Sequence, residues 1–206
     1  MLLVLAIPFL LVFGFFHVAT TGFERLGFSP VMVFAVLAAM LVGSFVNIPL
    51  GRRRWVEVEE SRFFGLVKRR GLRAQGLAVN VGGAIIPLLL VAYLVPRVPL
   101  EETALASGLM VVICFLLARV VPGKGITIPV LFPALFATIF ALVLAFEAAP
   151  LVAFAAGTIG VIVGGDLLHL PGVLRHNQGV MSIGGAGVFD GIFLVAIVAT
   201  FLAGLL

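Results

Sequence analysis

Charged residues are scarce in this sequence, and their shortage excludes several classes of protein. Asp, Glu, Lys and Arg make up 11% of the 206 residues, while hydrophobic residues make up 63%. Soluble globular domains average about 25% charged and about 45–50% apolar residues. A water-soluble enzyme, a disordered tail and a nucleic-acid-binding module are therefore excluded. The single cysteine, Cys114, also excludes an internal disulfide, so helix packing in lipid must hold the fold together.

Several widespread catalytic motifs are missing as well. The sequence has no P-loop, no HExxH, no GxSxG and no CxxC. It therefore lacks the residues that the chemistries of these motifs require. No cofactor is predicted.

Long apolar stretches dominate what is present, and the mean hydropathy is +1.31. A helix needs about 20 mainly apolar residues to cross a bilayer core of about 30 Å. Seven stretches meet this length and predict an all-α, polytopic membrane protein with a single transmembrane domain over residues 1–206. The predicted spans are Leu2–Ala19, Pro30–Leu50, Gln75–Val95, Thr103–Val121, Gly125–Phe146, Leu151–Leu170 and Ser182–Leu206.

Lys and Arg predict the orientation of these spans. Eight of the thirteen cations lie in the loop of residues 51–74. If this loop is cytoplasmic, alternation places Arg119, Lys124 and Arg175 inside as well, and only Arg25 and Arg97 outside. Such an excess on one side is the positive-inside pattern. We therefore expect a cytoplasmic N-terminus and an external C-terminus.

The basic loop of residues 51–74 is the only sizeable segment expected outside the membrane. Its residues Trp55–Glu59 alternate between apolar and charged, as in a strand. A short hairpin or an amphipathic segment on the inner leaflet would fit this pattern. Membrane lipids, and anionic headgroups at this loop, are the predicted partners.

Two aspartates lie within predicted spans, beside clusters of glycine. An ionisable side chain inside a span costs at least about 2.5–3.5 kcal/mol on insertion scales, which makes it a functional hypothesis by default. Asp166 lies near the inner end of the sixth span, and Asp190 lies inside the seventh. If residues 184–187 are partly unwound, the two carboxylates reach similar depths in the cytoplasmic half of the bilayer.

Facing carboxylates favour two kinds of function. Two close carboxyl groups tend to share a proton. One could then activate water while the other protonates a substrate carbonyl, as in acid–base hydrolysis. The same pair could instead bind a proton or cation in a small carrier or channel, with Asn47 and Asn80 as neutral ligands. In a third interpretation each aspartate caps a broken helix in a structural membrane subunit.

Other polar residues lie toward the inner side, at a similar predicted depth. Lys124 is either a counter-ion to Asp166 or one more cation that sets topology. His169 is three residues from Asp166 and therefore shares its helical face. His169 and two aspartates would give three metal ligands without Glu or Cys support, so no metal is predicted. The candidate supporting residues are Asn47, Asn80, Lys124, His169, Gly187 and Gly191.

Five segments carry a resemblance to a known family. The chain resembles the prokaryotic, uncharacterised polytopic membrane proteins grouped as domain-of-unknown-function family 1614. The resemblance covers most of the chain and implies a multi-pass protein of the prokaryotic cytoplasmic (inner) membrane, without implying an activity. The segments are Gly43–Leu50, Asn80–Pro87, Pro122–Ile126, Gly165–Leu168 and Ser182–Leu194.

The chain is also similar in pattern to intramembrane aspartyl proteases of the presenilin and prepilin-peptidase kind. These enzymes use one aspartate on each of two neighbouring spans, the second within Gly-x-Gly-Asp. Here Gly187-Val188-Phe189-Asp190 keeps the first glycine of that motif, and Val163-Gly164-Gly165-Asp166 keeps the second. Presenilins carry Pro-Ala-Leu on a later span, whereas Pro133-Ala134-Leu135 precedes both aspartates here. The similarity implies Asp166 and Asp190 as a catalytic pair acting on a membrane-embedded peptide.

Overall fold

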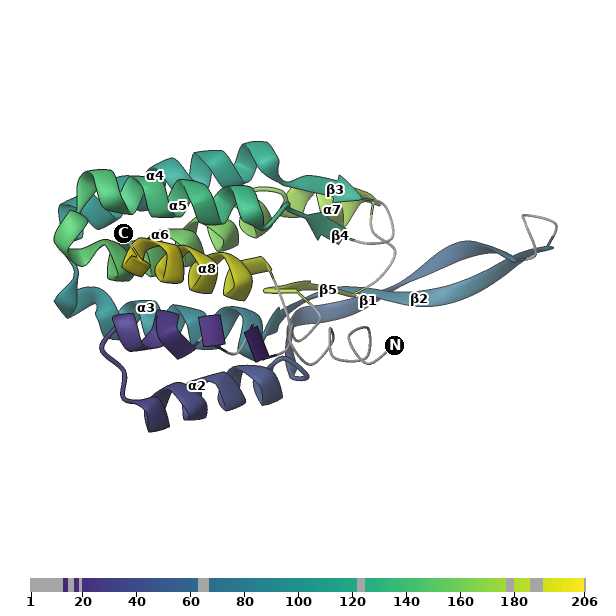
Figure 1. Ribbon diagram of the computed structural model, residues 1–206. Helices are drawn as coiled ribbons and strands as arrows, with labels where there is room; N and C mark the ends of the chain where they lie inside the picture. Colours follow the sequence, from purple (N-terminus) through teal and green to yellow (C-terminus); the bar gives the residue numbers. More distant parts are fainter. Residues whose placement is uncertain are drawn as a thin grey trace, which may run out of the picture.

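The computed structural model describes residues 13–14, 17–18, 20–62, 67–121, 125–176, 180–185 and 191–205. The body is mostly helical, as predicted, and its helices lie side by side with the strands gathered at one end (Figure 1). Residues 20–25 are helical and precede the named elements. These are α2 (Pro30–Gly43), β1 (Asn47–Arg62), β2 (Val67–Asn80), η1 (Val81–Ile85), α3 (Ile86–Leu94), η2 (Val95–Arg97), α4 (Leu100–Leu117), β3 (Arg119–Val121), β4 (Gly125–Thr127), α5 (Leu131–Leu144), η3 (Phe146–Ala148), α6 (Ala149–Gly160), η4 (Val161–Leu167), α7 (Leu170–His176), β5 (Val180–Ile183) and α8 (Gly191–Leu205).

Two sheets lie at one end of the helical body. Strands β1 and β2 form a long antiparallel hairpin, and β5 pairs in parallel with the last part of β2. The register places Asn47 opposite Asn80 and interrupts the ladder between Leu50 and Arg54. Strands β3 and β4 form a second antiparallel pair. The basic loop of residues 51–74 lies within the β1–β2 hairpin, which projects away from the helices (Figure 1); of the two predicted forms, the hairpin is therefore the observed one.

The core of the helical body is built mainly from small residues. Ala106, Ala137, Ala153 and Ala199 come from α4, α5, α6 and α8, and each has no exposed surface. A second cluster joins α2, α3 and residues 20–25 to α6 and α8, and it uses larger side chains such as Phe23 and Phe154. Helices α6 and α8 belong to both clusters, so they form the centre of the bundle.

Large apolar side chains cover the outside of the same helices. Phe34 on α2 is 75% exposed, and Val143 on α5 is 76% exposed. Two helical segments, Leu100–Leu117 and Phe146–Leu174, are long and apolar enough to cross a membrane. Shorter apolar helices occupy Pro30–Gly43, Val81–Arg97, Leu131–Leu144 and Leu194–Leu205.

Five of the seven predicted spans are wrong at one end, where the chain forms a strand rather than a helix. The second predicted span ends as a helix at Gly43, because Asn47–Leu50 belongs to β1. The third begins as a helix only at Val81, since the preceding residues belong to β2. The fourth and fifth spans include β3 and β4, and the seventh includes part of β5. Hydropathy cannot separate an apolar strand from an apolar helix, because burial favours both equally. The first predicted span, Leu2–Ala19, lies mostly outside the described residues.

Candidate functional site

Asn80 is the buried centre of a polar cluster at the strand end of the bundle. It is the last residue of β2, it caps η1, and its side chain has no exposed surface. Its Nδ2 amide donates to the carbonyl oxygen of Ser44 at 2.7 Å and to Oδ1 of Asn47 at 3.1 Å. The backbone N–H of Gly83 donates to its Oδ1 at 2.7 Å. One side chain therefore joins the end of α2, the start of β1 and the first turn of η1.

Asn47 extends this cluster to a third segment of the chain. Its Oδ1 also accepts a hydrogen bond of 2.6 Å from the hydroxyl of Ser182 in β5. Because β5 pairs with β2, Ser182 lies opposite Ala78, two residues before Asn80. The hydrogen bonds and the sheet together hold three distant segments in one place.

Glycines let these segments approach more closely than any side chain would permit. A Cβ atom on Gly82 would overlap the carbonyl oxygen of Met40, and one on Gly83 would overlap the carbonyl oxygen of Gly184. Gly184 has a φ of 81°, in the left-handed region that favours glycine. Here η1 packs against both α2 and the turn after β5, and replacement of these glycines requires the backbone to move.

Asp166, in η4, contacts the same turn after β5. Its side chain is partly buried, and its Oδ2 accepts a hydrogen bond of 3.0 Å from the backbone N–H of Gly184. The wide turns of η4 follow α6 directly, and π-helical segments of this kind are frequent at functional sites. Gly164, two residues before Asp166, packs against the backbone of Val111 in α4. The η4 backbone thus packs against α4 at Gly164, and the Asp166 carboxylate is bonded to the turn after β5.

His169 closes the end of η4. Its Nδ1 lies 3.1 Å from the carbonyl oxygen of Gly164 and 3.0 Å from that of Gly165. Carbonyl oxygens only accept hydrogen bonds, so Nδ1 carries the proton and donates it. The ring also lies against Phe115, with centroids 4.9 Å apart. This geometry gives His169 a capping role at the end of the π-helical segment.

The structure brings several of the predicted site residues to one end of the bundle. Asn47 and Asn80 bond each other directly, and Asp166 reaches the same region through Gly184. Gly191 is the first residue of α8, which packs against η4. Asp190, Lys124 and Gly187 lie outside the described residues. Within the described residues, no group of three His, Cys, Asp or Glu side chains could hold a metal ion.

Sequence reasoning missed Ser44, Ser182 and Gly184 as parts of this cluster. Ser44 and Gly184 contribute backbone atoms, for which a sequence offers little signal. Ser182 stood only at the start of a predicted span. The available signal was the repeated Gly-Gly pair, which occurs at 82–83, 164–165 and 184–185, since all three pairs belong to this cluster or its supporting contacts.

A family described as "Protein of unknown function (DUF1614)" matches residues 41–202. This match confirms the family resemblance and covers the whole candidate site from Asn47 to Gly191. It contains no information on activity. No curated protein and no solved structure matches the chain.

Proposed function

We propose that this chain, which belongs to the DUF1614 family, is a multi-pass protein of the prokaryotic inner membrane that acts as an intramembrane aspartyl hydrolase. Asp166 and Asp190 would be the catalytic pair, and a membrane-embedded peptide would be the substrate. The observation that carries the proposal is the Asp166 carboxylate, partly buried at one end of an apolar bundle and bonded to the Gly184 N–H.

The distribution of large and small residues supports a membrane location. Helices in lipid gain nothing by burying large apolar groups, so they pack through small residues and leave large ones toward the acyl chains. The alanine-rich cluster of α4, α5, α6 and α8 follows that rule, with Ala137 and Ala153 fully buried, and Phe34 and Val143 on the outside of the bundle are about three-quarters exposed. In water, apolar patches of this extent are rare on a monomeric protein.

The positions of the cations support the predicted orientation. The β1–β2 hairpin contains the basic loop and projects from the same end as the polar cluster (Figure 1). Arg97 ends η2 on the far side of α3 from that cluster. Arg25 lies beside Gly204, close to the end of α8. We therefore place the hairpin and the polar cluster in or near the cytoplasm, and Arg25, Arg97 and the C-terminus outside.

In the proposed reaction, one carboxylate removes a proton from water as the water oxygen attacks the peptide carbonyl carbon. The other carboxyl group protonates the carbonyl oxygen. The tetrahedral intermediate then breaks its C–N bond, and a proton passes to the leaving nitrogen, which yields a carboxylic acid and an amine. The hydrogen bond from Gly184 to Asp166 stabilises negative charge on this carboxylate, so we assign Asp166 as the base and Asp190 as the acid.

The alternative, a proton- or cation-coupled carrier or channel, has less support because its neutral ligands are occupied. The Asn80 amide donates two hydrogen bonds and its oxygen accepts one, while the Asn47 oxygen accepts two. These side chains hold the segments together, and a cation would have to displace those bonds. The remaining alternative, a purely structural subunit, is an outcome of the test below.

The test compares membranes that contain the wild-type protein, Asp166→Asn or Asp190→Asn. New peptide termini would be mapped by mass spectrometry after incubation in ¹⁸O-labelled water, because hydrolysis places one label in each new carboxyl group. Both variants should lose the labelled termini that the wild type produces. Glu147→Gln, an exposed change in η3, is the matched control and should retain them. If all samples, including the wild type, contain the same labelled termini, the hydrolase proposal is refuted and the purely structural interpretation remains.

A further inference from the structure

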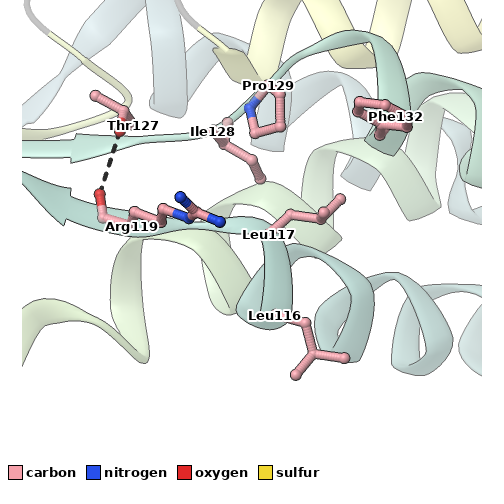
Figure 2. Close-up of a pocket in the computed structure, with 7 residues that line it drawn as sticks. All are labelled: Leu116, Leu117, Arg119, Thr127, Ile128, Pro129 and Phe132. Carbon is pink, nitrogen blue, oxygen red and sulfur yellow. Dashed lines mark hydrogen bonds between the residues drawn. The ribbon is translucent and has the colours of Figure 1, made fainter.

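A pocket lies apart from the polar cluster, where α4 ends and α5 begins. Its volume is about 490 Å³. Leu116, Leu117, Ile128 and Phe132 supply apolar walls, and Arg119 supplies a positive charge (Figure 2). The pocket therefore combines an apolar surface with one cation.

Arg119 stands at the point where a membrane-crossing helix would leave the hydrocarbon. It follows the end of α4 by two residues, and α4 is one of the segments long and apolar enough to span. The Thr127 hydroxyl donates to the carbonyl oxygen of Arg119 at 3.3 Å and ties β4 to β3. This bond uses the Arg119 backbone. In the part of the chain that the structure describes, no carboxylate pairs with the Arg119 guanidinium.

The walls of the pocket face the same surroundings as the outside of the bundle. Leu116 is 70% exposed and Phe132 is 53% exposed. Of the residues that line the pocket, Arg119 alone is charged, and it adds a positive charge to these apolar walls. An occupant that matches both features carries an anionic group on an apolar body.

We propose that this pocket binds one anionic phospholipid from the leaflet on the hairpin side. The Arg119 guanidinium pairs with the headgroup phosphate, because its planar donors match phosphate oxygens. Leu116, Leu117 and Phe132 contact the start of the acyl chains. This inference rests on the proposed membrane location, and it is independent of the hydrolase chemistry at Asp166.

The test measures lipid binding to purified, delipidated protein by native mass spectrometry. Phosphatidylglycerol and phosphatidylethanolamine would be titrated against the wild type, Arg119→Gln and Arg97→Gln. Arg97 is the matched control, since it is also exposed, does not line the pocket, and donates from its guanidinium to the Tyr93 hydroxyl in α3. Loss of one charge-assisted contact should weaken phosphatidylglycerol binding to Arg119→Gln about tenfold, and Arg97→Gln should bind like the wild type.

Three results would overturn the inference. The first is equal affinity of the wild type and Arg119→Gln for phosphatidylglycerol. The second is equal affinity of the wild type for phosphatidylglycerol and phosphatidylethanolamine. The third is that soluble glycerol phosphate competes as strongly as the lipid itself. A separate flotation assay with phosphatidylglycerol and phosphatidylethanolamine vesicles tests the membrane location. Wild-type protein that stays in the aqueous phase without detergent would refute that location and the lipid site together. Protein that floats but fails the binding test would refute the lipid site alone.

Discussion

Replacement of Asn80 by alanine should destabilise the protein more than the loss of any other side-chain hydrogen bond in the polar cluster. The change removes two buried hydrogen bonds of 2.7 Å, to the Ser44 carbonyl and from the Gly83 N–H. A buried partner left unsatisfied costs about 1–3 kcal/mol, so the free energy of unfolding should fall by about 2–5 kcal/mol. For a chain of this length, about 2–4 °C of Tm accompanies each kcal/mol. We therefore expect a Tm about 5–15 °C lower, measured by circular dichroism in detergent.

Two further variants separate hydrogen bonding from packing. Asn47→Ala removes an exposed acceptor, whose former donors retain other partners or water, and should cost only about 1 kcal/mol. Asn80→Asp keeps the size of the side chain but places an oxygen opposite the Ser44 carbonyl, so it should be no more stable than Asn80→Ala. The reasoning fails if Asn80→Ala unfolds within roughly 2 °C of the wild type. It also fails if Asn80→Asp is fully stable, because the Ser44 carbonyl would then not depend on the Asn80 amide as its donor.

The remaining predictions concern glycine packing, Asp166 and topology. Gly83→Ala should prevent correct folding or lower Tm strongly, because its Cβ would overlap a backbone carbonyl. The Cβ of Gly108→Ala in α4 would meet nothing within 4 Å, so this variant should be neutral or stabilising by about 1 kcal/mol. Equal Tm values for the two variants would contradict this reasoning. Asp166→Asn keeps an acceptor for the Gly184 N–H and should change Tm little. Asp166→Ala removes that acceptor and should lower the free energy of unfolding by about 1–2 kcal/mol. If Asp166→Asn is the less stable of the two variants, this hydrogen bond is not what stabilises the site. A protease site inserted in residues 52–73 should be cut only from the cytoplasmic side, and a reporter fused after Leu206 should be located on the outer side. The opposite location of either one would reject the proposed orientation.

Hydropathy located most of the helices, but it could not show where each helix ends. The apolar stretches around α2, α4, α5 and α6 were predicted as helical, and they are. Residues 47–50 and 75–80 were also part of predicted spans, but they form strands. Their extended conformation depends on pairing with each other and with Val180–Ile183. A partner more than 100 residues away has no effect on a local hydropathy average, so this part of the fold could not be predicted.

The sequence indicated some of the residues that meet in the polar cluster, but not their contacts, for a similar reason. Asn47, Asn80, Asp166 and His169 stood out because polar side chains are rare in apolar stretches and costly there. Their assigned roles depended on partners that a sequence does not indicate. The sequence places His169 near Asp166, for example, but only the structure shows that its Nδ1 donates to the carbonyls of Gly164 and Gly165.

The sequence by itself determined the apolar character of the chain, the concentration of cations in one segment and membership of the family. These properties follow from composition and from the order of residues, and they need no three-dimensional information. Only the tertiary structure decided which polar groups meet, as when the Ser182 hydroxyl bonds Asn47 across 135 residues. A hydrogen bond requires two groups to lie about 3 Å apart, and the path of the backbone, held close by glycines that lack a Cβ, brings those groups together.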